Sequence, residues 1–261
     1  MGYDTVSSRL LRPGTLEKRL AMCEKCGCSD SREPGQHRAS AVHASAHAHG
    51  SAAAELSGHD RLAERNRGFF RAKRLFVINL LSFAGSDAHA FVTCTAAACR
   101  WRLQVITPDV LERLQARHVH AGDSPPAPGL ADNVALDAHG IAHALDHLNL
   151  DQTDILLLEN AGSAASQAVH DLGETARVAL FSVRDGVFKP LKFPLLFAGA
   201  AAVVITGMDQ AAAAGFDLSQ ARAHIAQVAP AAQVLPVAAA TGAGVGAWLA
   251  FLDASVKQTK A

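Results

Sequence analysis

The stretch that decides the fold of this chain lies at residues 75–90 and reads LFVINLLSFAGSDAHA. Leu75–Leu81 is an apolar run interrupted only by Asn79, which is typical of a strand buried on both faces of a sheet. A short loop around Gly85 follows, and a helix-forming stretch starts at Ala88. Together they predict a strand, a loop and a helix, the unit from which α/β domains are built.

The same alternation continues to the end of the chain. Five more apolar runs are predicted to be buried strands, at Leu103–Ile106, Ile155–Leu158, Val178–Val183, Ala201–Ile205 and Gln233–Val237. Helices are expected at Ala88–Cys99, Val110–Arg117, Asn133–Leu148, Leu191–Ala198, Leu218–Val228 and Gly244–Asp253. This order predicts an α/β fold with a doubly wound, mostly parallel sheet, in which ligands bind at the carboxyl ends of the strands.

Composition limits the class of protein. Of the 261 residues, 49% are hydrophobic and 18% are charged, so most of the chain is expected to be globular. Basic and acidic residues both number 24, and zero net charge argues against binding nucleic acid or an anionic membrane through bulk charge. No apolar run reaches the roughly 18 residues that span a bilayer, and residues 1–22 lack the apolar core of a secretory signal. We therefore expect a cytoplasmic protein whose five cysteines are thiols or metal ligands.

The chain is predicted to have two regions. Residues 1–59 are interpreted as a flexible, Cys- and His-rich tail, because Ser29–Gly58 holds few large apolar residues that could offset the entropy of ordering it. Residues 60–261 are predicted to form the folded domain, which opens with a helix capped by Asp60.

The loop after the first strand has the position of a phosphate-binding loop but not its residues. Such a loop needs a glycine, then a lysine and then a serine or threonine, because backbone N–H groups and the lysine contact the phosphates while the hydroxyl ligates Mg²⁺. Here these positions hold Asp87, Ala88 and His89. A carboxylate repels phosphate, and Mg²⁺ prefers oxygen to imidazole. These residues therefore predict weak or absent binding of a magnesium nucleotide.

A compact cysteine cluster lies near the start of the chain. Cys23, Cys26 and Cys28 place three sulfurs within six residues, enough to wrap one soft or borderline cation. No second Cys-x-x-Cys pair follows, which disfavours an all-cysteine zinc knuckle. We interpret the cluster as a metal site, the alternative being three reduced thiols without a metal.

Histidines offer two further sets of ligands. A diffuse tract would bind Ni²⁺ or Zn²⁺ loosely, or else is a polar linker, and it comprises His37, His43, His47, His49 and His59. His139, His143 and His147 recur at every fourth residue of one predicted helix and therefore share a face. This stripe is either a divalent-metal site or a solvated face.

Several segments carry a resemblance to a known family, namely Cys23–Cys28, Arg61–Arg67, Val77–Leu80, Leu158–Gly162, Asp171–Glu174, and Ser182–Val183 through Lys189–Pro194. In these the chain resembles the HypB-type nickel-incorporation GTPases of NiFe-hydrogenase maturation, from Met22 onward. The resemblance implies a P-loop NTPase fold of the SIMIBI-like type and GTP-driven nickel insertion. It also implies HypA-type maturation partners and a hydrogenase large-subunit precursor, with a homodimer left open.

The family's nucleotide-binding positions are partly kept. The resemblance assigns this role to Gly85 and Ser86 in the loop, to Asp109, to Glu159 and Asn160, and to Asp209. The guanine-reading Asn-Lys-x-Asp of the family is Thr206-Gly207-Met208-Asp209 here, so Asp209 has lost its asparagine partner and is equally an N-cap for residues 210–214. The family's second metal pair, Cys-His ahead of Leu136, is Val134-Ala135 and is not carried over.

For the cysteine cluster, the resemblance implies Ni²⁺, with Zn²⁺ as the other candidate, in a tetragonal site with a fourth nitrogen ligand. That ligand is the terminal amine if translation starts at Met22, and otherwise a backbone amide or His37.

Three functions follow from these observations. The favoured one is a nickel-binding accessory protein for hydrogenase assembly whose GTP binding and hydrolysis are weak or lost. The alternatives are an active GTPase switch that drives nickel insertion, and a non-enzymatic scaffold that pairs with an intact paralogue or maturation factor. No catalytic nucleophile is evident in the sequence, and no role for nucleic acid or a membrane is expected.

Overall fold

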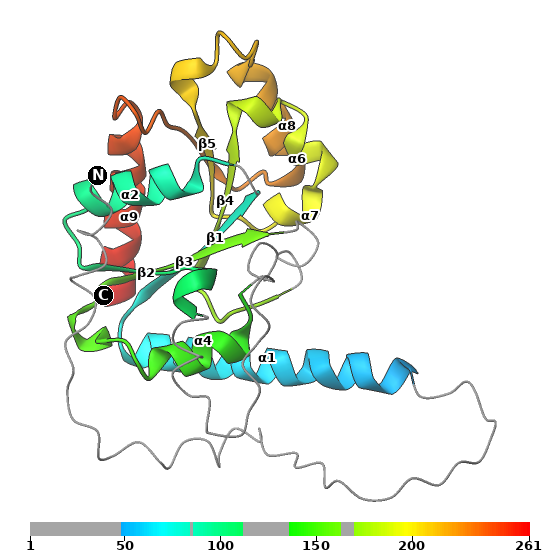
Figure 1. Ribbon diagram of the computed structural model, residues 1–261, viewed down its shortest axis with the longest axis vertical. Helices are drawn as coiled ribbons and strands as arrows, with labels where there is room; N and C mark the ends of the chain where they lie inside the picture. Colours follow the sequence, from blue (N-terminus) through cyan, green and yellow to red (C-terminus); the bar gives the residue numbers. More distant parts are fainter. Residues whose placement is uncertain (1–47, 84–85, 112–135, 163–169) are drawn as a thin grey trace, which may run out of the picture. The chain divides into compact units, whose positions relative to one another are not determined.

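The computed structural model describes residues 48–83, 86–111, 136–162 and 170–261, with the backbone alone for residues 48–59. The strands are β1 (Phe76–Phe83), β2 (Leu103–Ile106), β3 (Ile155–Gly162), β4 (Ala176–Ser182), β5 (Ala202–Thr206) and β6 (Gln233–Pro236). They form a six-stranded sheet in the order β2-β3-β1-β4-β5-β6, and every neighbouring pair is parallel (Figure 1). All six lie where the sequence predicts strands, so the predicted doubly wound parallel sheet is confirmed.

Helices cover both faces of this sheet (Figure 1). One face packs against α2 (Ala88–Ala98) and α9 (Val245–Lys260). The other face packs against α1 (Ala48–Ala72) and α4 (Ala138–Leu145) at the β3 side, and against α6 (Lys189–Lys192), α7 (Pro194–Phe197) and α8 (Leu218–Val228) at the β5 side.

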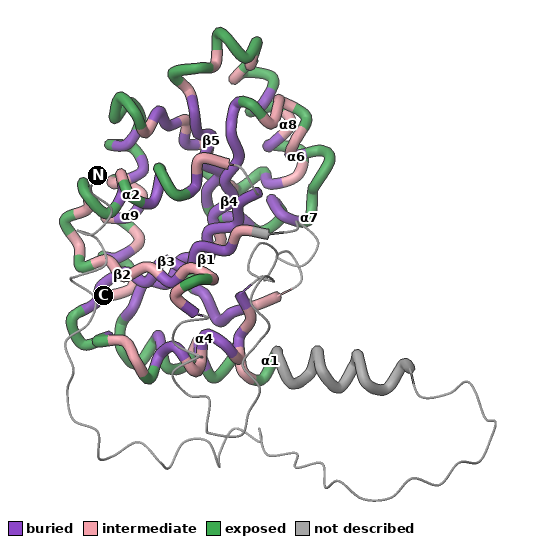
Figure 2. Tube along the Cα trace, in the orientation of Figure 1, coloured by how far each residue is buried: buried purple, intermediate pink, exposed green. Residues whose placement is uncertain are grey.

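Strand β1 lies at the centre of the core. All eight of its residues are buried, and they alternate between the two faces because successive side chains of a strand point in opposite directions. Ile78 belongs to the cluster that contains Phe91 of α2 and Trp248 of α9, whereas Val77 belongs to the cluster that contains Phe70 of α1. Figure 2 shows β1 and β5 in the colour of buried residues.

The strand order places the candidate site. The chain leaves β1 toward β2 and β3 on one side, then crosses β1 to reach β4 on the other. The order therefore reverses between β1 and β4, and in open parallel sheets ligands bind in the crevice beyond the carboxyl ends of the strands at such a point.

Several element boundaries differ from the prediction. Helix α1 begins at Ala48, so Asp60 lies inside it and is not an N-cap, and α1 runs through the predicted boundary between residues 59 and 60. The predicted helix at Leu191–Ala198 is split into α6 and α7 at Phe193, because Pro194 has no N–H and cannot continue the preceding helix.

Two further differences concern functional positions. Strand β3 extends to Gly162, so Glu159 and Asn160 are strand residues rather than loop residues. Helix α4 is shorter than predicted, because Asp137 caps its start by accepting from Gly140 N at 2.6 Å and the helix ends at Leu145. Residues 112–117 of the predicted helix at Val110–Arg117 lie outside the described residues.

Within the described ranges, no helix is both long enough and apolar enough to span a bilayer.

Candidate functional site

The loop after β1 shows what replaces a phosphate-binding loop. Gly85 lies outside the described residues, and Ser86 N donates to Phe83 O at 3.0 Å to close the turn. Ala88, at the lysine position, is buried in the core with Phe91, while His89 is exposed. Positions 87–89 therefore supply no lysine ammonium and no hydroxyl where a magnesium nucleotide would need them.

Asp87 lies at the carboxyl edge of the sheet, directly before α2. Its carbonyl accepts from Phe91 N at 2.9 Å, but its carboxylate makes no capping hydrogen bond to α2. Instead, Oδ2 accepts from Ser182 Oγ at the end of β4 at 3.4 Å. A Cβ added to Gly207 at the end of β5 would lie 3.4 Å from the same oxygen. The carboxylate thus lies against the ends of β4 and β5, and it would meet any anion in the crevice with a like charge.

Glu159 is a buried acid at the carboxyl end of β3, with 9% of its surface exposed. Burial raises its pKa above the ordinary value, the charge of Asp109 raises it further, and His89 works in the opposite direction. No hydrogen bond or ion pair to the Glu159 carboxyl group is found among the described residues. A buried carboxyl group with a raised pKa at the end of a strand is a candidate functional group.

Asn160 faces the other side of the sheet. Its Nδ2 donates to Asn79 Oδ1 at 3.4 Å, and its Oδ1 accepts from Leu136 N at 3.3 Å. Neighbouring residues of a strand point to opposite faces, so Glu159 and Asn160 do not converge on one ligand through their side chains. In this structure Asn160 joins β3 to β1 and to the segment before α4.

The predicted guanine contact lies at the end of β5. Asp209 is exposed and belongs to the short 3-10 turn Met208–Gln210, whose N-cap is Gly207. The alternative interpretation of Asp209 as an N-cap is therefore wrong. Gly207, with a positive φ of 70°, is the N-cap of this turn, and Asp209 lies inside the turn. The structure brings Asp87 beside Gly207, but it does not pair Asp209 with another predicted residue.

Lys189 makes two side-chain contacts that the sequence did not predict. Its Nζ lies 3.8 Å from the ring centroid of Phe83, the last residue of β1, and it forms an ion pair with Asp185 Oδ1 at 3.0 Å. A cation over an aromatic face is favourable, so Lys189 ties α6 to the strand that carries the loop. The run Lys189–Pro194 was noted only as part of the family resemblance.

The predicted metal ligands separate into two groups. Cys23, Cys26, Cys28 and His37 lie outside the described residues. His139 and His143 come together on α4, with 3.1 Å between their Nε2 atoms, whereas His147 lies beyond the end of the helix and does not continue the stripe. Within the described ranges, no three His, Cys, Asp or Glu side chains are placed to hold one metal ion.

The segments that resembled a known family also build the opposite, amino end of the sheet. Arg67 of α1 donates from Nη2 to both oxygens of Asp171, at 2.8 and 2.6 Å. Asn66 Nδ2 donates to Leu172 O at 3.2 Å and to Ala138 O at 2.9 Å. The side chains therefore hold α1, α4 and the loop before β4 together, which is a structural role.

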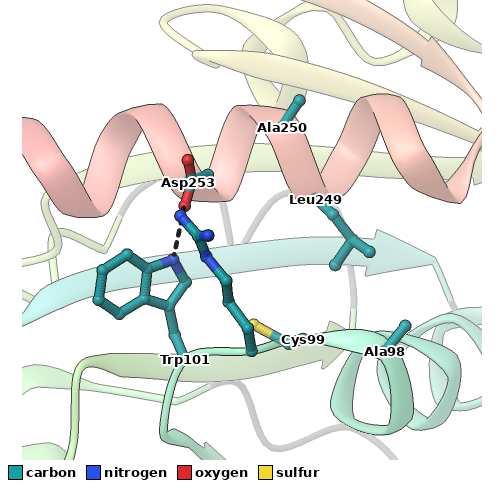
Figure 3. Close-up of a pocket in the computed structure, with 7 residues that line it drawn as sticks. Ala98, Cys99, Trp101, Leu249, Ala250 and Asp253 are labelled. Carbon is teal, nitrogen blue, oxygen red and sulfur yellow. Dashed lines mark hydrogen bonds and ion pairs between the residues drawn. The ribbon is translucent and has the colours of Figure 1, made fainter.

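Two pockets lie away from the carboxyl edge. The larger, about 650 Å³, is lined by residues of α1, α9 and the amino ends of the strands, including Phe70, Phe76 and Phe251. The smaller, about 280 Å³, lies between α9 and the segment before β2 (Figure 3). Trp101 Nε1 there donates to Asp253 Oδ1 at 3.2 Å, and burial raises the pKa of the Cys99 thiol. Neither pocket is lined by Asp87, Glu159 or Ser182, so neither belongs to the candidate site.

A six-stranded parallel sheet with a loop and a helix after its central strand defines a P-loop-type α/β protein. A comparison with models of protein families gives no match. Hydrogenase maturation factor HypB of Azotobacter vinelandii is 35% identical over 201 residues, covering 76% of this chain and 66% of that protein. HypB of Escherichia coli strain K12 is 34% identical over 201 residues, covering 76% of this chain and 69% of that protein. The chain belongs to the HypB family of hydrogenase maturation factors.

Solved structures agree with this assignment. HypB from Archaeoglobus fulgidus superposes with a TM-score of 0.63 at 28% identity, covering 76% of this chain and 98% of that one. HypB from Helicobacter pylori in complex with nickel gives a TM-score of 0.66 over 77% of this chain and 95% of that one, and its 23% identity supports the fold alone. The chain spans about two thirds of the length of the two curated relatives, 66% and 69%.

Proposed function

We propose that this protein acts in hydrogenase maturation as a nickel-carrying accessory factor whose nucleotide cycle is weak or lost. Its relatives are named hydrogenase maturation factors, which supports the process. The observation that carries the weakened cycle is the Asp87 carboxylate, which stands at the glycine position of the loop and bonds to Ser182 across the crevice.

The residues present do not fit a magnesium triphosphate. A hydrogen bond to a charged group contributes about 1.5–3 kcal/mol, and this contribution is missing where Ala88 replaces lysine. Asp87 adds repulsion, and the imidazole of His89 replaces the hydroxyl that Mg²⁺ prefers. All three changes oppose GTP binding, so no step of the proposed mechanism passes through the nucleotide.

Nickel is proposed to bind at the cysteine cluster. Cys23, Cys26 and Cys28 supply three thiolates, and the terminal amine of a chain that starts at Met22, a backbone amide or His37 completes the set. Thiolates favour soft and borderline cations, which include Ni²⁺ and Zn²⁺. One solved relative is described as being in complex with nickel. The bound metal is cargo, which this chain holds and passes on.

The proposed partners are a HypA-type maturation factor and the precursor of a hydrogenase large subunit. Figure 1 shows α6 and α7 beside the end of β1, and this surface carries four exposed large apolar residues, Phe188, Leu191, Phe193 and Leu195. The resemblance to the HypB family is what suggests these two partners.

An active GTPase switch is the second candidate, and Glu159 is the observation in its favour. A buried acid with a raised pKa and without a bonded cation among the described residues is costly, and such groups are kept where they act on a ligand. Steady GTP hydrolysis by the purified chain would favour this candidate over the first.

Calorimetric titration of one preparation with Mg·GTP and then with Ni²⁺ tests the proposal. We expect a saturable Ni²⁺ site that is lost in the Cys23→Ser, Cys26→Ser, Cys28→Ser variant, and no saturable Mg·GTP binding at millimolar concentration. The variant Cys94→Ser is the matched control, because Cys94 packs against the core and should leave the Ni²⁺ site unchanged. Ni²⁺ binding by the triple variant with undiminished affinity and stoichiometry, or rapid GTP turnover by the unaltered chain, would overturn it.

A further inference from the structure

The imidazoles of His139 and His143 face each other on α4. Their Nε2 atoms are 3.1 Å apart, the ring centroids are 4.5 Å apart and the rings are inclined at 74°. Both side chains are half-buried. Residues four apart share a helix face, and here one ring nitrogen of each imidazole lies within hydrogen-bond distance of the other.

The backbone beneath this pair is held firmly. Eight residues form a marginal helix in isolation, yet α4 is capped by Asp137 and buries Ile141 and Ala144 in the core cluster of α1. Asn66 Nδ2 of α1 donates to Ala138 O at 2.9 Å. Because packing already orders α4, bringing the two imidazoles together for a ligand costs little further ordering.

The separation of the two nitrogens selects a class of metal. With metal–nitrogen bonds of about 2.1 Å, nitrogens 3.1 Å apart subtend an angle of about 95° at the metal. A tetrahedral site, as Zn²⁺ prefers, would need a separation of about 3.4 Å. An angle near a right angle fits two adjacent positions of a tetragonal site, the geometry of Cu²⁺ and Ni²⁺.

We propose that His139 and His143 form a two-imidazole site for a tetragonal divalent cation, Ni²⁺ or Cu²⁺. Among the described residues no third His, Cys, Asp or Glu joins them, and the remaining positions are open to water or to a further donor. Such an open site holds a metal exchangeably. This proposal rests neither on the nucleotide chemistry nor on the cysteine cluster. It gives the folded domain a metal-binding site of its own.

The test uses the full chain, with the cysteines at 23, 26 and 28 changed to serine and Cu²⁺ as the probe. Amide NMR signals are followed during the titration, because paramagnetic Cu²⁺ broadens only nearby signals. We expect substoichiometric Cu²⁺ to broaden residues 138–145. A chelating pair exceeds a single ligand by two orders of magnitude or more, so His139→Gln and His143→Gln should each require on the order of a hundredfold more Cu²⁺ for the same broadening.

His224→Gln is the matched control, because His224 lies on α8 with its Nδ1 2.8 Å from Val187 O. It should retain the broadening of α4. Metal-free spectra show whether each variant folds, and His139→Asn and His143→Asn replace any glutamine variant that does not. The proposal is wrong if α4 is unaffected by equimolar Cu²⁺ in the parent, or if the broadening survives loss of both histidines. Failure of the Ni²⁺ titration at the cysteine cluster would leave this result unchanged, so the two proposals fail separately.

Discussion

The two ends of the sheet each contain a buried glutamate, and the two are treated in opposite ways. Glu174 at the amino end accepts from Arg177 Nε at 2.6 Å, from Leu172 N at 2.7 Å and from Asn79 Nδ2 at 3.3 Å. The carboxyl group of Glu159, at the carboxyl end, has no hydrogen bond or ion pair within the described residues, and burial raises its pKa. Burying a carboxylate costs less free energy when hydrogen bonds and ion pairs satisfy its oxygens than when they do not.

This difference separates the family's segments by role. At the amino end, Arg67 donates to Asp171 and Asn66 donates to Leu172 O, and these bonds hold the fold. At the carboxyl end, positions 87–89 of the loop hold Asp87, Ala88 and His89 in place of the family's glycine, lysine and threonine. The amino end of the sheet therefore keeps the bonds that hold the scaffold, whereas the carboxyl end has an altered nucleotide loop.

The largest expected effect on stability is at Gly173, which lies in the loop before β4 and packs against α1. Its φ is +86°, and an added Cβ would lie 2.5 Å from Ala63 O and 2.8 Å from Arg67 N. Gly173→Ala combines backbone strain with a clash against backbone atoms, so we expect it to lower the free energy of unfolding by about 3 kcal/mol. Urea denaturation followed by circular dichroism measures this.

Gly199→Ala is the control for that change. Gly199 has a similar φ of +74°, but a Cβ there would meet no atom within 4 Å. Strain alone should cost about 1 kcal/mol. Equal losses in the two variants would show that the contact of Gly173 with α1 contributes nothing.

The next effect is expected at Glu174, whose side chain is 4% exposed. Glu174→Gln removes the charge that pairs with Arg177 and leaves that cation, 25% exposed, without its partner. We expect a loss of about 2 kcal/mol, since breaking a buried pair from one side is strongly destabilising and partial exposure reduces the cost. Urea denaturation at pH 7 measures this loss. An unchanged midpoint would show that the bonds of Glu174 do not stabilise the fold.

A smaller and pH-dependent effect is expected at Asp154, which precedes β3. The hydrogen bonds from Arg102 hold its pKa below the ordinary value, with Lys260 adding to this and burial opposing it. A lowered folded-state pKa stabilises the protein above the ordinary value of 3.8, and this stability is lost as the pH falls below it. Asp154→Asn should therefore cost up to about 1 kcal/mol at pH 7 and progressively less below pH 4.

Glu159→Gln should give the smallest change, with the opposite sign. A raised pKa means that the ionised form is penalised in the folded state, and this penalty is full above the folded-state pKa and vanishes below the ordinary value of 4.5. The variant should be slightly more stable than the parent at pH 7 and equal to it in acid. Thermal unfolding across this range checks the sign, and a loss at pH 7 would show that Glu159 is structural.

Much of the fold could be predicted from the sequence, because its strands are continuous apolar runs. All six were located, and α8 has the predicted bounds, Leu218–Val228. Boundaries failed where tertiary contacts or single residues decide them. Asp137 starts α4 later than the sequence indicated, and Pro194 breaks a helix that composition alone would continue.

The site was only partly predictable. Substitutions at 87–89 are visible by alignment to the loop pattern, and the spacing of His139 and His143 implied that they meet. The contact of Asp87 with Ser182 joins residues 95 apart in the chain, and no local pattern signals it. The opposite orientations of Glu159 and Asn160 became evident only because β3 extends past them.

The central claim is that this HypB-family chain keeps the scaffold of a GTPase without a working nucleotide site. The most direct test compares the chain with its Asp87→Gly, Ala88→Lys, His89→Thr variant by calorimetric titration with Mg·GTP. We predict no saturable binding by the parent and clear binding by the variant, since the three changes restore the phosphate and magnesium contacts. Tight Mg·GTP binding by the parent, unimproved by the substitutions, would contradict the account.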